Sequence, residues 1–345
     1  MLDDLKRIAL RDKSDTLGVA EKQVEQLKTQ FDLEIEHPDL RNVVFAGMGG
    51  SALYAEMARS WPGVTVPYQI VKRYDIPDHV NEHTLFIASS FSGNTEETLS
   101  CLEQAEAKGA VIVIISAGGK LVKIAEEKGY PIAKLNHDIP QPRMAAFEGF
   151  KALISVLDAA DICHNKAHEL DDVVSKLEGA TAEWRPDVPT SKNLAKQIAN
   201  ELMGRSIVIY AGPFLAPVDY KWKISFNENS KNLAWANTYP EFNHNEFIGW
   251  TSHPVDKPYA IINLMSEYEH PRVQKRFEIS DRLLSGQRPH PITVEAQGDS
   301  KLEQILWLTM LGDFVSLYLG LLNGLDPEPV ALVEKLKQEM VKRDS

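Results

Sequence analysis

The sequence predicts an α/β protein with two domains, each a doubly wound parallel sheet flanked by helices. Short apolar runs alternate with helical patterns through the first half of the chain, and a similar alternation starts again near residue 192. Runs such as 111–115 are apolar at every position, which is typical of strands buried on both faces of a parallel sheet. Repeated strand-then-helix order is the pattern of the doubly wound class.

The first half is expected to contain five strands and three helices. The strands are placed at 43–46, 68–71, 85–88, 111–116 and 132–135. The helices are placed at 52–60, 96–108 and 120–128, and a longer helical region runs from 145 to about 177. Ligands of such sheets bind at the carboxyl ends of the strands, so the turns that follow the strands are the places to look for a site.

A proline-rich break at 181–191 predicts a linker between an N-terminal domain (1–180, with N-terminal helices) and a C-terminal domain (192–345). The second domain is expected to contain helices at 193–202, 301–322 and 329–342, a helix that starts near Pro217, and strands at 206–210, 259–264 and 292–296. Two halves of similar make-up suggest an internal structural repeat.

Composition narrows the class of partner and the compartment. The formal net charge of −12 over 345 residues disfavours nucleic acid and anionic membrane surfaces. Cys101 and Cys163 give no disulfide framework, and the charged N-terminal segment lacks a signal-peptide core, so we expect a cytoplasmic protein. The longest apolar stretch, 305–325, contains Asp313 and is expected to be a buried helix rather than a membrane span.

The most informative segment is the serine-rich turn 89–98, between the strand 85–88 and a helix. Ser90, Ser92 and Thr95 place three hydroxyls around Gly93 at the start of that helix. Free amides and the positive dipole end of a helix favour an anion at such a turn. The turn has no lysine, which argues against a Walker-type nucleotide loop and favours a single phosphate ester. The ordinary alternative is a Ser/Thr helix cap, which requires only one hydroxyl.

A second turn, 47–51, follows the strand 43–46 and is rich in glycine. Gly50 and Ser51 stand at the start of the next helix, where glycine permits close approach of the backbone to a ligand. The usual interpretation of such a turn is a dinucleotide site. A dinucleotide site would need an acidic residue about twenty residues after the turn, to bind the ribose. The segment 66–70 stands at that distance and contains no Asp or Glu, which weakens that interpretation.

Several segments together resemble the bifunctional phosphoglucose/phosphomannose isomerases. The turns 90–98 and 47–51 resemble the phosphosugar-binding turns of sugar isomerase (SIS) domains in general. The narrower resemblance is carried by the segments 141–145, 227–231, 241–246, 312–319 and 326–330. The matches extend from about residue 45 to about residue 337 and imply two SIS-type domains.

The resemblance implies an aldose–ketose isomerase that interconverts glucose 6-phosphate and fructose 6-phosphate through an enediol. Phosphate would be bound by Gly50, Ser51, Ser90, Ser92 and Thr95. The chain lacks a His/Cys/carboxylate set with metal-ligand spacing, so no metal or other cofactor is expected. A phosphorylated sugar is the expected substrate, and a homodimer is expected because the resemblance implies that His244 serves the neighbouring subunit.

Catalytic roles follow from the same resemblance. Glu228 would carry the proton between C1 and C2, because such a transfer needs a base on one face of the sugar. Arg143 would stabilise the enediolate with its permanent charge, and His244 would help to open the ring in the neighbouring subunit. The alternatives are a solvated loop acid for Glu228, a surface salt bridge for Arg143, and a metal site of His244 with two nearby glutamates, Glu241 and Glu246.

A lysine near the C-terminus completes the family site. Counting from the family's Asp-Pro-Thr-Pro pattern favours Lys335, with Lys337 as the alternative. Glu328 occupies the position of the family's threonine, whose small size is thought to leave room for mannose-type stereochemistry at C2. The departure bears on activity with mannose 6-phosphate and leaves open an isomerase of another phosphorylated sugar. A non-catalytic sugar-phosphate sensor is the other open function, because SIS domains also serve in regulators.

Overall fold

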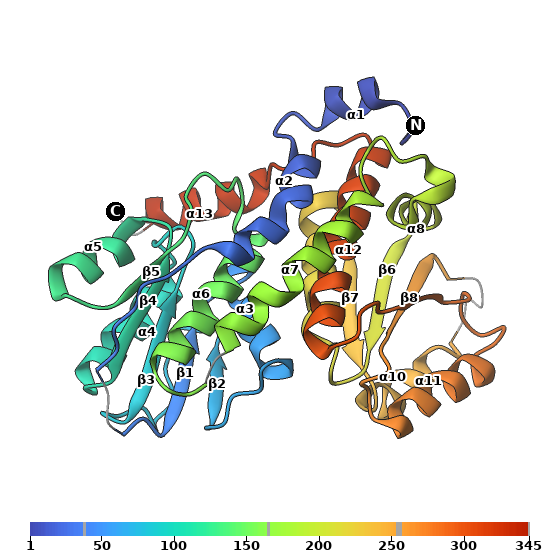
Figure 1. The fold of residues 1–345 in the computed structure, drawn as a ribbon. Coiled ribbons are helices and arrows are strands. Elements are labelled where there is room, and N and C mark those ends of the chain that lie inside the picture. Colours follow the sequence, from blue (N-terminus) through green and yellow to red (C-terminus); the bar gives the residue numbers. More distant parts are fainter. Residues whose placement is uncertain (37–38, 164–165, 253–256, 344–345) are drawn as a thin grey trace.

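The computed structural model describes residues 1–36, 39–163, 166–252 and 257–343. It contains two parallel sheets that lie side by side, with helices α3, α6, α7 and α12 between them (Figure 1). The predicted fold class, two α/β domains with parallel sheets flanked by helices, is confirmed.

The first sheet has five parallel strands in the order β2-β1-β3-β4-β5. They are β1 (Asn42–Ala46), β2 (Tyr68–Val71), β3 (Thr84–Ser89), β4 (Val111–Ser116) and β5 (Ile132–Lys134). All five predicted strands are present, and their limits agree with the prediction to within one residue.

Alternate residues of these strands belong to two different cores. Val43 and Phe45 of β1 pack with α3 (Gly50–Ser60) and α6 (Ala146–Ala159), whereas Val44 packs on the opposite face with α4 (Glu96–Ala107) and α5 (Gly119–Lys128). Both faces of the sheet are therefore buried, which is why its strands are continuously apolar.

The second sheet has four parallel strands in the order β7-β6-β8-β9. They are β6 (Ser206–Ala211), β7 (Ala234–Thr238), β8 (Tyr259–Met265) and β9 (Ile292–Glu295). Strand β7 was not predicted. It lies at the edge of the sheet, where Ala234 is its one buried residue, so its sequence lacks the apolar run that identifies the other strands.

The remaining helices complete the layers around the sheets. They are α1 (Leu5–Arg11), α2 (Thr16–Lys22), α7 (Lys166–Ala182), α8 (Leu194–Leu202), α9 (Ala216–Ser225), α10 (Glu246–Gly249), α11 (Pro271–Leu283), α12 (Lys301–Leu322) and α13 (Ala331–Arg343). The helical region predicted from 145 to about 177 is two helices, α6 and α7, because the chain turns at Asp161, which has a φ of 61°.

Helix α12 is the central helix of the second half. The helix is long enough for a membrane span, and an 18-residue window of it has a mean hydropathy of 1.8. However, 89% of this window is buried inside the protein. Trp184, within the predicted linker 181–191, is buried against Trp307 and Phe314 of α12. The predicted linker thus contains a residue of the core, and the domain limits stay a prediction.

The order of elements supports the predicted internal repeat and shows one deletion. Strands β7, β6, β8 and β9 stand next to one another in the second sheet as β2, β1, β3 and β4 do in the first, with β6 in the place of β1. The second domain has no counterpart of α5 and β5 among its described residues, because β9 leads directly into α12. The β6–α9 turn consequently corresponds to the glycine-rich β1–α3 turn.

In the second domain this corresponding turn is filled by a carboxylate of the chain itself. Glu269, from the turn after β8, accepts hydrogen bonds from the amides of Phe214 (3.3 Å) and Leu215 (3.1 Å) at the start of α9. Gly212 permits this approach, because a Cβ on it would lie 2.3 Å from the Glu269 carboxyl carbon. Burial raises the pKa of Glu269, and the two amide hydrogen bonds act in the opposite direction.

Candidate active site

The three hydroxyls of the serine-rich turn converge after β3. Ser90 Oγ lies 2.7 Å from Thr95 Oγ1 and 3.4 Å from Ser92 Oγ, and it accepts a hydrogen bond from the amide of Gly93 (3.1 Å). Thr95 directly precedes α4, yet its side chain makes no capping hydrogen bond to the described residues of that helix. The turn is therefore not an ordinary Ser/Thr cap, and the first amides of α4 remain available to an anion.

The two predicted phosphate turns touch each other. Ser51 Oγ accepts a hydrogen bond from the amide of Phe91 (2.9 Å), which joins the β1–α3 turn to the serine-rich turn. Ser51 and Ser90 are buried, whereas Ser92 is exposed. Ser51 and Ser90 thus shape the anion-binding cradle that the two turns form. Of the three serines, Ser92 has the hydroxyl most accessible to a ligand.

Gly50 brings the segment of Arg143 against the same turn. A Cβ at Gly50 would lie 2.9 Å from both the amide nitrogen of Arg143 and the carbonyl carbon of Pro142. Only a residue without a side chain permits this approach of α3 to the short helical turn Pro142–Met144. Gly50 is therefore explained by packing of the site, in addition to any contact of its own with a ligand.

Arg143 is almost completely buried, with 1% of its surface exposed, and it connects three segments. Its Nε donates to Asn229 Oδ1 (2.6 Å) and its Nη1 to Glu228 Oε2 (3.0 Å). Its Nη2 donates to the carbonyl oxygens of Pro327 (3.1 Å) and Glu328 (2.9 Å). The surface salt bridge considered as an alternative is thus excluded.

The electrostatics of Arg143 follow from this position. Burial lowers its pKa, and the nearby carboxylates of Glu228, Asp313 and Glu328 oppose that shift. Guanidinium has five N–H donors and stays charged in proteins. Four are used by the acceptors above, and the described residues offer no acceptor to the fifth, on Nη1 beside Glu228.

Glu228 lies in a π-helical turn, Phe226–Ser230, which continues α9. A π-turn adds a residue to the helix and often occurs at functional sites. The Glu228 side chain is 33% exposed while its partner Arg143 is buried, so the carboxylate can reach both the guanidinium and a ligand from solvent.

The segment 326–328 covers the other side of Arg143. Gln141 Nε2 donates to Glu328 Oε1 (2.5 Å), and the amide of Glu328 donates to Asp326 Oδ1 (3.2 Å). Glu328 is thereby placed beside Arg143 through its main chain, with its carboxylate held by Gln141. The residue that departs from the family pattern is thus part of the cluster.

His244 and Lys335 are not brought into this cluster. His244 is exposed in the short helix Glu241–His244, and no contact of its side chain with Arg143 or Glu228 is found in the described structure. Lys335 and Lys337 lie on α13, whose side chains from 331 to 340 are all exposed. Lys337 pairs with Glu334 on the same helix (2.8 Å).

The glutamates of the alternative metal site have other partners. Glu246 accepts hydrogen bonds from the Tyr210 hydroxyl and from Asn237 Nδ2 (2.6 Å), and Glu241 accepts one from Asn245 Nδ2 (2.6 Å). Within the described ranges, no group of three or more His, Cys, Asp or Glu side chains is arranged to hold a metal ion.

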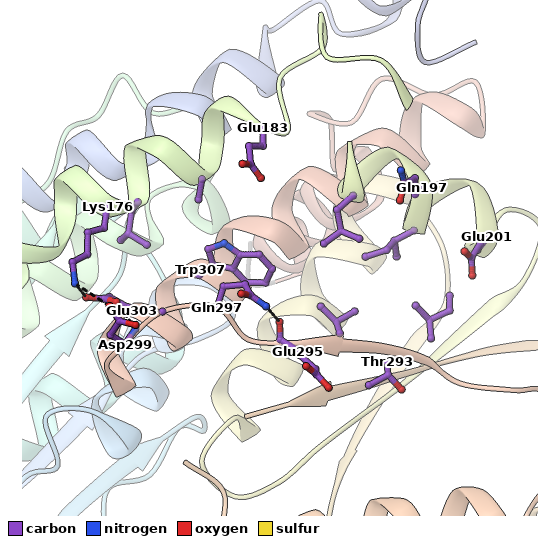
Figure 2. Close-up of a pocket in the computed structure, with 17 residues that line it drawn as sticks. Lys176, Glu183, Gln197, Glu201, Thr293, Glu295, Gln297, Asp299, Glu303 and Trp307 are labelled. Carbon is purple, nitrogen blue, oxygen red and sulfur yellow. Dashed lines mark hydrogen bonds and ion pairs between the residues drawn. The ribbon is translucent and has the colours of Figure 1, made fainter. Parts of the chain in front are cut away.

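A large groove lies away from these residues, between α7, α8, β9 and α12 (Figure 2). Its volume is about 900 Å³, Trp307 lies within it, and Lys176 pairs with Glu303 at one end (2.6 Å). None of the predicted site residues lines this groove. The volume of a groove therefore does not locate the predicted site residues in this molecule.

Comparison with known proteins identifies the family. Residues 191–340 match the bacterial phospho-glucose isomerase C-terminal SIS domain. The chain is 34% identical to the bifunctional phosphoglucose/phosphomannose isomerase of Aquifex aeolicus over 93% of this chain and 98% of that protein. It is 32% identical to the protein of the same name from Caldicellulosiruptor bescii, over 91% and 94% of the two chains.

The chain belongs to the bifunctional phosphoglucose/phosphomannose isomerase family. The predicted resemblance is thereby confirmed, and the chain is a phosphosugar isomerase of this family. The fold agrees with solved structures. A glucose-6-phosphate isomerase like protein from Thermus thermophilus superposes with a TM-score of 0.65 over 96% of this chain and 99% of that chain, at 18% identity.

The sequence analysis assigned no role to three residues that belong to the site. Asn229 accepts a hydrogen bond from Arg143, and Gln141 donates one to Glu328. Lys231 contacts the segment 326–328. Each stands within three residues of Arg143 or Glu228, which is the one signal that the sequence offers. Their partners are up to 187 positions away, so their roles depend on the tertiary fold.

Proposed function

We propose that the protein interconverts glucose 6-phosphate and fructose 6-phosphate by proton transfer through an enediol. One observation carries this proposal, the chain of contacts that joins the serine-rich turn to Arg143 and Glu228 through Ser51 and Gly50. A phosphate at the first end and the reacting carbons at the second would suit a substrate with its phosphate on a terminal carbon.

The roles of the two central residues follow from their surroundings. Glu228 is the base that takes the proton from one carbon and returns it to the next, because its carboxylate is partly exposed and fixed by Arg143. Arg143 stabilises the enediolate oxygen with its fifth N–H, at a place where burial strengthens the interaction. The oxygen that gains charge would thus lie beside the base.

Ring opening requires further groups, and we assign it to His244 and Lys335 by family resemblance. Because His244 is exposed and makes no contact with its own cluster in the described structure, it serves the site of a second copy in a homodimer. Exposed apolar side chains support such an assembly, among them Ile248 near His244 and Leu332 and Leu336 on α13. Light scattering during turnover tests this, since a fully active monomer would contradict it.

A coupled assay tests the proposed reaction. Fructose 6-phosphate is supplied, and glucose 6-phosphate is detected with a dehydrogenase, with and without EDTA; mannose 6-phosphate is supplied in a parallel arm. We expect turnover of fructose 6-phosphate that EDTA does not reduce. Loss on chelation with recovery on adding zinc would contradict the metal-independent mechanism. Binding of sugar phosphates without turnover would favour a sensor, and turnover of another sugar alone would favour a different isomerase.

A further inference from the structure

Lys231 ends the π-helical turn that carries Glu228. It adopts a left-handed conformation with a φ of 54°, and its amide donates to the carbonyl of Phe226. A non-glycine residue rarely adopts this conformation. The turn it makes ends the helix three residues after Glu228, and its side chain contacts a segment nearly one hundred positions away.

The Lys231 ammonium binds the segment 326–328 through its main chain. Its Nζ donates to the carbonyl oxygens of Asp326 (3.0 Å) and Pro327 (2.9 Å). Arg143 Nη2 donates to the carbonyl oxygens of Pro327 and Glu328. Two cations therefore hold three consecutive carbonyl groups, and they share the oxygen of Pro327.

This shared oxygen couples the segment to the orientation of the guanidinium. Two of the four acceptors of Arg143 are carbonyls of that segment. If the segment moved, Arg143 would keep Asn229 and Glu228 but would lose what fixes its Nη2 end. The remaining N–H, which is the one available to substrate, would then lose its direction.

We propose that Lys231 is a positioning residue that holds the segment 326–328 against Arg143 and thereby orients the guanidinium toward the reacting oxygen. The inference deepens the proposed function and rests on it. Lys231 acts through Arg143 and not on the substrate, so it should affect turnover more than binding.

The charge of Lys231 depends on pH within the range of ordinary assays. The groups that face it are Arg143, Glu228, Asp326 and Glu328, and burial of its ammonium followed by the charge of Arg143 lowers its pKa to about 8. The three carboxylates oppose this shift. Above that pH the side chain becomes a neutral amine, which binds the carbonyls less strongly. Activity limited by this contact should decline as pH rises through about 8.

The test compares Lys231→Met, Lys231→Arg and a control, Lys223→Met. Lys223 lies on α9 with its ammonium over the ring of Tyr220, outside the site. None of the three changes adds backbone strain, because methionine and arginine tolerate the same conformations as lysine. We expect Lys231→Met to lower kcat about 10²-fold with little change in KM, since a small misplacement of a catalytic group has effects of this size.

Lys231→Arg should restore most of the kcat and move the basic limb of the pH profile upward, because guanidinium stays charged. Hydrogen exchange gives a readout independent of activity, as the amides in 325–330 should exchange faster in Lys231→Met but not in Lys223→Met. A wild type that turns over no sugar phosphate defeats the proposed function. An active wild type with unchanged kcat, pH limb and exchange in Lys231→Met overturns this inference alone.

Discussion

At the scale of single residues, Arg143 shows how burial and function combine in one side chain. Removing a guanidinium from water is costly unless its donors find acceptors, and here four of five do. The acceptors come from segments 85 to 185 positions apart from it in the chain. A residue that is held so firmly in the fold is also fixed in direction, as the proposed stabilisation of the enediolate requires.

Glu228→Gln should abolish exchange of the C2 hydrogen with solvent and lower kcat by about 10²–10⁴-fold, because the amide cannot act as the base. Binding of substrate should change little, since the phosphate turns are untouched. NMR in deuterated solvent measures the exchange as deuterium incorporated at C2 of glucose 6-phosphate or at C1 of fructose 6-phosphate. Glu178→Gln is the control, as Glu178 pairs with Lys28 outside the cluster. Exchange at the wild-type rate in Glu228→Gln would transfer the role to another acid, with Glu241 and Glu246 the next to examine.

The double variant Ser92→Ala and Thr95→Ala should raise KM for the sugar phosphate about tenfold or more and lower kcat less. A hydrogen bond to a charged group contributes about 1.5–3 kcal/mol, and two donors are removed from the cradle. Ser100→Ala is the control, because Ser100 lies on α4, the helix that follows the turn, and contacts Tyr74. Steady-state kinetics of the three proteins decide, and an unchanged KM in the double variant would contradict the phosphate assignment.

Glu328→Thr should raise the rate with mannose 6-phosphate, relative to fructose 6-phosphate, about tenfold or more. The change removes a carboxylate beside Arg143 and frees Gln141, and differences of this kind in a pocket correspond to about 1–3 kcal/mol. Initial rates measured with each sugar in a separate assay give the ratio. A ratio that stays at the wild-type value would show that Glu328 does not limit access at C2.

The sequence predicted the hydroxyl cluster because its members stand within six consecutive positions after an apolar strand. It also pointed to Arg143 and Glu228, through family segments. It did not reveal Gln141, Asn229 or Lys231 as parts of the site, because their partners are distant in the chain. Lys335, chosen by counting, lies on an exposed helix in this structure, and its role stays a prediction.

At the scale of elements, the continuous apolar strands were the most predictable parts. Buried strands have a sequence signature on every residue, whereas the edge strand β7 has one buried residue and none of that signature. Helix α11 was also not predicted. Of its thirteen residues, Val273, Phe277 and Ser280 are buried, so its apolar face is narrow. The π-helical turn could not be predicted, because it differs from an α-helix by one hydrogen-bond register.

Gly50→Ala should destabilise the fold by about 1–3 kcal/mol and lower kcat, because its Cβ would meet backbone atoms of Pro142 and Arg143. Helix α3 and the turn Pro142–Met144 would have to separate. Gly179→Ala in α7 is the matched control. Its Cβ would meet nothing within 4 Å, so the change should be neutral or stabilise by up to about 1 kcal/mol. Thermal unfolding and kcat of both variants are compared; equal behaviour would contradict the close approach.

At the scale of the whole molecule, the two halves meet through α3 and α9, and Asp219 lies in the first turn of α9. It is buried, and its Oδ2 has no hydrogen-bond partner among the described residues. Burial raises its pKa well above the ordinary value, the Tyr220 amide opposes the shift, and Glu269 adds to it. The folded state therefore binds this proton more tightly than the unfolded chain does.

Stability should consequently fall as pH rises from about 4, where the unfolded carboxyl ionises, toward the raised pKa of the folded state. Asp219→Asn removes the titrating group, so it should stabilise the protein at pH 7 and flatten this dependence. Chemical denaturation at pH 4 to 8 measures both effects. A variant less stable than wild type at pH 7, with the same slope against pH, would contradict the assignment.

The carboxylate of Glu269 at the start of α9 has a consequence for how the molecule responds to its surroundings. The amides at the start of α9 are bonded to a carboxylate of the chain itself, which folding alone puts in place. The contact between Glu269 and the start of α9 is therefore independent of metabolite concentration. Binding of a ligand at the serine-rich turn would therefore stabilise the first half, whereas the contact of Glu269 with α9 stabilises the second half at every ligand concentration.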